Sequence, residues 1–175
     1  MHHERLDGSG YHRACHGRDQ TMGARVLALD ISPERLAQAK AMGADAVINS
    51  AKDDPVEALM TLTGGLGVEK SLDCSGKAPA RLAAVQATRT WGSVCYVGEG
   101  GNVTLDVSPH LLRRQLTLVA SWTFSTHIQA ECARFVADRQ IPVQDLFSHR
   151  WNLAQAEEAY RLFDQQDAGK GVILF

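Results

Sequence analysis

The stretch Val26-Leu-Ala-Leu-Asp30, followed by Ile31-Ser-Pro-Glu-Arg35-Leu36, decides the fold class of this chain. An apolar strand ends in an acidic residue, and a helix start follows at once. Ser32 is a favourable N-cap, Pro33 suits the first helical turn, and Glu34 suits the positive end of the helix dipole. The second strand of a doubly wound nucleotide-binding sheet ends in such an acid, which holds a ribose. The stretch therefore predicts a dinucleotide-binding domain.

The phosphate-binding motif of such a domain is missing from its expected place. A G-x-G-x-x-G turn should lie about 20 residues before Asp30. Residues 1–22 instead hold Gly8-Ser-Gly10, four of the seven histidines and little periodic apolar character. We therefore expect the first strand and the glycine-rich turn to be missing or altered, with residues 1–21 as an atypical N-terminal segment. One hypothesis is a shifted reading frame, because the codons for residues 8–13, moved by one nucleotide, can encode G-V-G-I-T-G.

From residue 22 onward, apolar runs and turn signals alternate regularly. Strands are predicted at residues 26–29, 46–48, 68–74, 93–97, 116–120 and 172–175. Helices are predicted at residues 33–42, 54–64, 78–89, 128–139 and 153–163, with a short helix beginning at Ser108-Pro109. Strands that alternate with helices across short turns imply a parallel sheet with right-handed crossovers. The expected fold class is α/β, a Rossmann-type doubly wound parallel sheet.

The composition limits the classes of partner. The chain has 175 residues, 45% of them apolar and 22% charged, with a formal net charge of −2. This balance is typical of a globular domain and predicts no nucleic-acid or membrane partner. No apolar run reaches transmembrane length. The four cysteines are widely separated and form no C-x-x-C pair, so we expect neither disulfides nor a structural zinc, and a cytoplasmic location.

Several ordered motifs carry a family resemblance. They are M-G-A-R-V-L-A-L-D-I-S-P-E-R-L from Met22, G-A-D-A-V-I-N-S from Gly43, L-D-C-S-G from Leu72, W-G-S-V-C-Y-V-G-E-G-G from Trp91 and L-A-Q-A-E-E-A-Y-R-L-F from Leu153. Over residues 22–175 the chain resembles zinc-type medium-chain alcohol and polyol dehydrogenases, such as the sorbitol and threonine dehydrogenases. The resemblance implies an NAD-binding domain at residues 22–145. It also implies a C-terminal segment, 146–175, which packs on the catalytic domain in that family.

The activity that this resemblance implies is hydride transfer between an alcohol and NAD, with a catalytic zinc as Lewis acid. In the family, an N-terminal catalytic domain supplies the zinc ligands, and no motif of such a domain precedes Met22. We therefore expect zinc only in a full-length parent. We also expect no catalytic or metal-binding residue in this chain and no activity of the chain by itself.

Two candidate cofactor residues lie at the opening stretch. Asp30 would accept hydrogen bonds from the adenosine ribose, and it favours NAD over NADP because a 2′-phosphate would meet a like charge. Arg35 lies on the first turn of the next helix, and in the family a residue there can flank the adenosine. Each also has an alternative role as a solvated charge beside a helix start.

Four further candidates follow later strands, at the edge where ligands bind in open α/β folds. They are Ser75 on the adenine side, Gly98 close to the nicotinamide, and Ser121 and Trp122 facing the nicotinamide or substrate. Gly98 lets a ligand approach the backbone closely, although it also suits a plain turn. Trp122 also suits the core. A metal cluster at residues 12–16 is not expected, because His12, Cys15 and His16 lack a fourth ligand at zinc-site spacing.

Two other function classes stay open. The first is a methyltransferase-like fold, in which the second strand also ends in an acid that holds a ribose. The second is a non-enzymatic remnant, a truncated or frameshifted product with at most an interaction role. A missing central strand would leave apolar strand edges exposed, so we also expect self-association.

Overall fold

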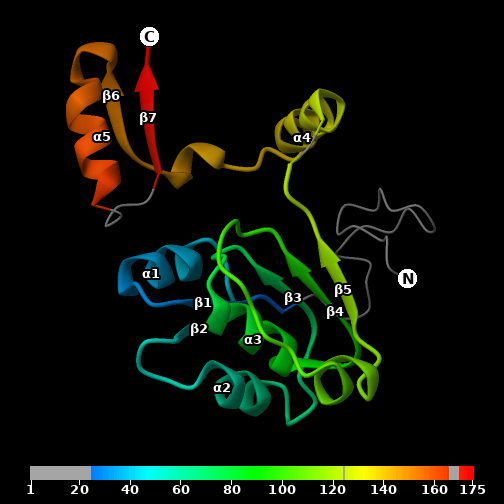
Figure 1. Ribbon diagram of the computed structural model, residues 1–175. Coiled ribbons are helices and arrows are strands. Elements are labelled where there is room, and N and C mark those ends of the chain that lie inside the picture. The colour runs from blue at the N-terminus through cyan, green and yellow to red at the C-terminus, as the bar shows by residue number, and fades with distance from the viewer. Residues whose placement is uncertain (1–24, 124, 166–169) are drawn as a thin grey trace. The chain divides into compact units, whose positions relative to one another are not determined.

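The computed structural model describes residues 25–123, 125–165 and 170–175 (Figure 1). Its contacts define one compact unit that runs to Ser121 and a second unit at Trp122–Phe175. The domain boundary predicted after residue 145 therefore lies inside the second unit. The first unit ends just after the strand that ends at Ala120. The atypical segment 1–21, its shifted-frame hypothesis and the altered glycine-rich turn lie outside the described residues.

The first unit alternates strands and helices as predicted. Its elements are β1 (Leu27–Asp30), α1 (Pro33–Ala41), β2 (Ala46–Asn49), α2 (Pro55–Leu62), β3 (Val68–Asp73), α3 (Ala78–Ala87), β4 (Thr88–Tyr96), the π-helical turn η2 (Val107–Leu112) and β5 (Thr117–Ala120). Every strand pair in this unit is parallel, so the predicted α/β class is confirmed. β4 begins at Thr88 rather than at the predicted residue 93. Thr88 is fully buried, and its hydroxyl lies 2.5 Å from the hydroxyl of Ser71 in β3.

The strands of this unit form two hydrogen-bonded groups, β1–β2 and β3–β4–β5. In the second group, Cys95 of β4 lies between Leu72 of β3 and Val119 of β5. In the strand order 3-2-1-4-5-6 of a doubly wound sheet, the two groups flank the place of the first strand. Within the described part of the unit, no strand joins β1 to β3.

A small apolar core links the two strand groups. Ile48 of β2, Leu59 of α2 and Ala87 at the end of α3 are buried together. Leu27 of β1 and Val68 of β3 pack against them. Helix α2 therefore contacts both strand groups through one cluster.

Two helix starts in this unit follow from local sequence. The Ser32 hydroxyl accepts a hydrogen bond from the Arg35 amide at 3.3 Å and so caps α1. The Asp54 carboxylate accepts one from the Glu57 amide at 2.8 Å and caps α2. Each cap precedes a proline in the first helical turn, where the missing N–H has no intrahelical partner to lose. These caps fix where each helix leaves the strand edge.

The second unit contains a parallel strand pair joined by a helix. Its elements are α4 (Thr126–Asp138), the 3₁₀ turn η3 (Val143–Leu146), β6 (Phe147–Asn152), the 3₁₀ turn η4 (Leu153–Gln155), α5 (Ala156–Asp164) and β7 (Lys170–Leu174). β6 was not predicted, although Phe147, His149 and Trp151 alternate with exposed polar residues and so have the period of a strand. Trp151 pairs with Ile173 across the two strands. No helix among the described residues is long and apolar enough to cross a membrane.

We expect the 175-residue chain to self-associate or to unfold in part. Within the described residues, β1 pairs only with β2, and β3 pairs only with β4. A buried N–H or C=O without a partner costs about 1–3 kcal/mol, and strand edges readily pair with other chains. Size-exclusion chromatography with light scattering, followed by a thermal melt, measures both outcomes. A sharp cooperative melt from a clean monomer would contradict the expectation.

Candidate functional site

The candidate residues of the first unit lie at the carboxyl ends of its parallel strands. β1 ends at Asp30 and β3 ends at Asp73, while Gly98 and Ser121 follow β4 and β5. Ligands in open α/β sheets bind outside this edge, because the strand ends and the helix starts that follow them present polar groups there. The side chains and loops at these strand ends therefore form the candidate site.

Asp30 holds the turn into α1 with one carboxylate oxygen and faces Arg35 with the other. Its Oδ1 accepts a hydrogen bond from the Ser32 amide at 2.9 Å, which forms an Asx turn. Its Oδ2 lies 3.8 Å from Nη1 of Arg35, a separation longer than a hydrogen bond. The Asp30 side chain is 29% exposed, so a ligand hydroxyl can reach it. The structure brings Asp30 and Arg35 together and leaves the Asp30 carboxylate partly exposed.

Asp73 ends β3 with a similar turn but is almost completely buried. Its Oδ1 accepts hydrogen bonds from the Ser75 amide at 3.0 Å and the Ser75 hydroxyl at 2.7 Å. Its Oδ2 accepts from the Gly76 amide at 3.2 Å and from Nε of Arg81 at 3.3 Å. The side chains of Asp73 and Arg81 are 2% and 13% exposed. The pair is therefore a largely buried ion pair that holds the Ser75-Gly76 turn.

Arg81 joins this turn to the loop that follows β4. Its Nη2 donates to the Gly98 carbonyl at 2.6 Å, and its Nη1 donates to the Gly101 carbonyl at 2.8 Å. The guanidinium also lies 5.5 Å from the centre of the Tyr96 ring. The Tyr96 hydroxyl donates to the Arg81 carbonyl at 3.0 Å. One arginine therefore connects Asp73, the Gly98–Gly101 loop and the end of β4.

These contacts shift the titration of two groups. Burial by itself raises the pKa of Asp73, but hydrogen bonds from Ser75, Gly76 and Arg81 outweigh burial and hold the pKa below its ordinary value. Burial and then the nearby Asp73 charge raise the pKa of Tyr96, and Arg81 opposes that rise. Asp73 is therefore a carboxylate at neutral pH, and Tyr96 is a neutral hydrogen-bond donor.

Glycines allow the two loops at this edge to touch. A Cβ placed on Gly98 would overlap the backbone nitrogen of Gly76, and one placed on Gly101 would overlap the Gly76 carbonyl oxygen. A Cβ on Gly76 would overlap the Glu99 carbonyl oxygen. The sequence predicted a glycine at 98 for close approach of a ligand. The described structure supplies a further reason, which is close approach of the neighbouring turn.

Comparison with known proteins identifies the family to which this chain belongs. The family model described as zinc-binding dehydrogenase matches residues 20–138. The chain belongs to the zinc-binding dehydrogenase family. The family resemblance read from the sequence motifs is thereby confirmed.

Individual relatives agree with this assignment. The chain is 38% identical over 152 residues to YphC, an uncharacterized zinc-type alcohol dehydrogenase-like protein of Escherichia coli, covering 86% of this chain and 43% of YphC. It is 30% identical over 147 residues to human sorbitol dehydrogenase, covering 82% of this chain and 41% of that enzyme. The solved structure of alcohol dehydrogenase TADH from Thermus sp. ATN1 matches with a TM-score of 0.78 and 26% identity, over 90% of this chain and 46% of that one. The chain thus spans about two fifths of the length of these curated relatives.

Three predicted residues remain. Ser75 and Ser121 follow β3 and β5 of the first unit, and Trp122 belongs to the second unit. Ser121 extends the β4–β5 pairing, since its amide donates to the Tyr96 carbonyl at 3.0 Å. Trp122 begins the second unit and is 77% exposed, so it does not contribute to the core of the described residues. Ser75 contacts Asp73 through its amide and its hydroxyl.

Sequence reasoning missed Asp73 and Arg81, which connect the Ser75-Gly76 turn to the loop after β4. A signal was present, because L-D-C-S-G places an acid before a turn at the end of a predicted strand, as at Asp30. Arg81 carried no signal of its own. Its position on α3, eight residues after Asp73, is that of an ordinary solvated helix charge.

The described residues contain no candidate metal-binding site. Over residues 25–123, 125–165 and 170–175, no group of three or more His, Cys, Asp or Glu side chains could hold a metal ion. His12, Cys15 and His16 lie outside these ranges. The described side chains therefore do not fit a catalytic zinc, and no zinc-dependent step is assigned to them.

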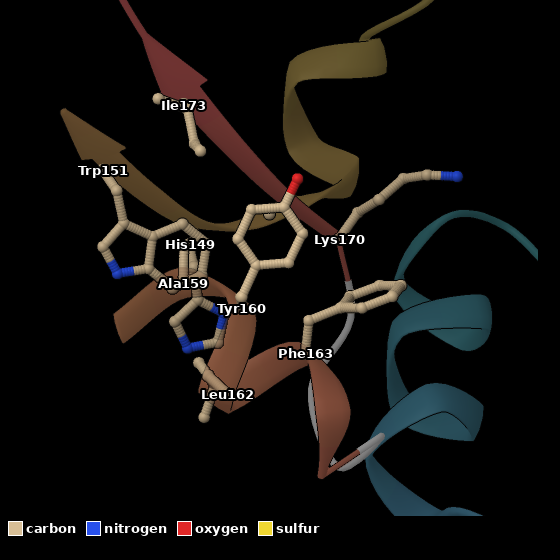
Figure 2. A pocket seen from close by; sticks show the side chains of 9 residues that line it. His149, Trp151, Ala159, Tyr160, Leu162, Phe163, Lys170 and Ile173 are labelled. Carbon is tan, nitrogen blue, oxygen red and sulfur yellow. The ribbon is translucent and has the colours of Figure 1, made fainter. Parts of the chain in front are cut away.

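The second unit carries an apolar hollow of about 330 Å³ beside α5. Figure 2 shows Trp151, Tyr160 and Phe163 around it, with Ile173 on the neighbouring strand and Lys170 at one side. Tyr160 and Phe163 are 71% and 69% exposed. The His149 and Trp151 rings stack at 5.3 Å. Exposed aromatic surface of this kind is typical of a face that packs against another protein surface.

Proposed function

We propose that this chain is the NAD-binding portion of a zinc-type alcohol or polyol dehydrogenase, an enzyme that transfers hydride between an alcohol and NAD. One observation carries the cofactor part of the proposal. Asp30 ends β1 at the carboxyl edge with a partly exposed carboxylate, one oxygen of which is oriented by the Ser32 amide. A carboxylate at this place accepts hydrogen bonds from ribose hydroxyls. Family membership supports the same class of ligand.

The proposed preference is for NAD over NADP. The Asp30 charge would oppose the 2′-phosphate of NADP, whereas it accepts hydrogen bonds from the free 2′-hydroxyl of NAD. Arg35 lies close enough to compensate part of that charge. Arginine at this place can accommodate a 2′-phosphate, so removing the Asp30 charge should move the preference toward NADP.

The proposal assigns hydride transfer to the longer enzyme and not to this chain alone. Zinc supplies the Lewis acid in that reaction, and the described side chains do not offer its ligands. The residues of this chain would bind and orient the dinucleotide. We also propose that the segment 146–175 docks on a catalytic domain through the apolar hollow beside α5, and that the protein is cytoplasmic.

Titration of the 175-residue chain with NAD, NADP and S-adenosylmethionine tests the cofactor assignment. We expect weak binding of NAD, weaker binding of NADP and no binding of S-adenosylmethionine. Replacing Asp30 with Asn should weaken NAD binding about tenfold, because hydrogen bonds to a charged acceptor are lost, and should leave NADP unchanged or tighter. Isothermal calorimetry or saturation-transfer NMR measures these constants.

The matched control is Glu69→Gln, which removes a carboxylate from the start of β3, near the opposite edge of the sheet. It should leave all three titrations unchanged. Binding of S-adenosylmethionine in place of NAD would favour a methyltransferase-like function. Absence of binding to all three ligands would favour the non-enzymatic remnant, and tighter binding of NADP than NAD by the unmodified chain would contradict the role of Asp30.

A further inference from the structure

Arg81 has a contact pattern that the proposed cofactor site does not use. Its guanidinium is largely buried, and each of its three nitrogens has a partner: Asp73 at Nε, Gly98 at Nη2 and Gly101 at Nη1. Two of these partners are backbone carbonyls of a single loop. The third is a carboxylate that itself holds the adjacent Ser75-Gly76 turn.

These contacts indicate that the Arg81 guanidinium sets the geometry of the Gly98–Gly101 loop. A planar guanidinium presents its donors in fixed directions, so it sets the separation of the groups that it binds. Arg81 spans the carbonyls at the two ends of the Gly98–Gly101 loop. Asp73 orients Arg81, and Gly98 is close enough to Gly76 that no side chain fits between the two backbones. The position of the loop is therefore set by a charged pair and not by apolar packing alone.

We propose that Arg81, oriented by Asp73, is a positioning residue that fixes the Gly98–Gly101 loop for the nicotinamide half of the dinucleotide. The proposal rests on the proposed function, since it assumes a dinucleotide at the carboxyl edge. Arg81 need not touch the ligand. It acts by presenting the Gly98 backbone at the strand end, while Asp30 on β1 serves the adenosine half independently.

Arg81→Met tests this assignment in the full 175-residue chain, because Met keeps the apolar stem and removes all three donors. The Gly98 amide donates to the Asp73 carbonyl at 3.0 Å. Without ligand, hydrogen exchange of this amide should become about tenfold faster, because the two carbonyl bonds that hold the loop are lost. Exchange in β1 and α1 should stay the same. NADH should bind about tenfold more weakly, whereas AMP, which contains only the adenosine half, should bind as before.

Two further variants complete the experiment, one conservative substitution and one control. Arg81→Lys keeps the charge but can reach only one carbonyl, so it should change the same readouts in the same direction by less, and it serves if Arg81→Met fails to fold. Arg89→Met is the matched control. Arg89 lies on the strand that leads to the Gly98–Gly101 loop but forms an exposed ion pair with Glu69 near the start of β3 and β4. Arg89→Met should change neither exchange of the Gly98 amide nor NADH binding.

Each outcome decides between the two proposals. Faster loop exchange with selective loss of NADH affinity supports the positioning role. Unchanged exchange overturns it, and so does faster exchange with equal losses of NADH and AMP, which would show a general structural effect. If the unmodified chain binds neither NADH nor AMP, the proposed function itself fails, and the positioning role fails with it.

Discussion

Replacing Asp73 with Asn is expected to lower the free energy of unfolding by about 3 kcal/mol. The amide oxygen can take the place of Oδ1 and still accept from the Ser75 amide and hydroxyl. The amide NH₂ group then stands in the place of Oδ2, where it cannot accept from the Gly76 amide or from Nε of Arg81. The change also leaves the largely buried Arg81 charge without its counter-ion. Breaking a buried pair from one side costs more than the pair contributes, because the remaining charge stays desolvated. Urea unfolding followed by circular dichroism measures the loss.

The control for this variant is Glu69→Gln, which removes the carboxylate of an ion pair with Arg89 whose side chains are 65% and 46% exposed. Exposed pairs contribute about 0–1 kcal/mol, so this variant should unfold almost as the unmodified chain does. Equal losses from the two substitutions would show that the Asp73 and Arg81 pair does not stabilise the strand edge.

The pH dependence of the Asp73→Asn effect has a definite sign. The folded-state pKa of Asp73 lies below its ordinary value, so its stabilising contribution is complete above the unfolded pKa of about 4. The contribution is lost as the pH falls below that value, through the folded pKa. The difference in stability between the unmodified chain and Asp73→Asn should therefore be constant near neutral pH and shrink in acid.

Gly98→Ala is the second substitution with a large expected effect, a loss of at least about 2 kcal/mol of stability. The φ angle of Gly98 is not in the left-handed region, so alanine would normally be tolerated or slightly stabilising there. The added Cβ would instead overlap the backbone nitrogen of Gly76 and crowd the carbonyl carbons of Cys74 and Ser75. Backbone atoms cannot move aside as the end of a flexible side chain can. A thermal melt monitored by circular dichroism should therefore show a lower midpoint.

Gly100→Ala separates this overlap from the ordinary cost of replacing glycine. Gly100 lies two residues further along the same loop, has a φ of +88°, and has open space where a Cβ would stand. Alanine there costs about 1 kcal/mol for the left-handed backbone alone. Gly98→Ala should therefore be the more damaging substitution. The opposite order would show that the two loops separate easily in solution.

The order of strands and helices could be predicted from the sequence because its signals are local. The α1 start at Ser32 and the α2 start at Asp54 each depend on a side chain and an amide three residues later. The apolar run of β1 gives its strand character in the same way. β6 carries an equally local signal, the alternation of Phe147, His149 and Trp151, and was missed because polar residues stand between them.

Asp30 and Asp73 show what the sequence alone determined and what only the tertiary structure decided. Each ends a strand, and each accepts a hydrogen bond from the amide two residues later, so sequence determined both turns. Their difference is burial, with side chains 29% and 2% exposed. That difference depends on Arg81, which reaches from Asp73 to the carbonyls of Gly98 and Gly101, 17 and 20 residues further along the chain. No local pattern encodes such contacts, because only the packing of α3 between the two loops places the guanidinium among these oxygens.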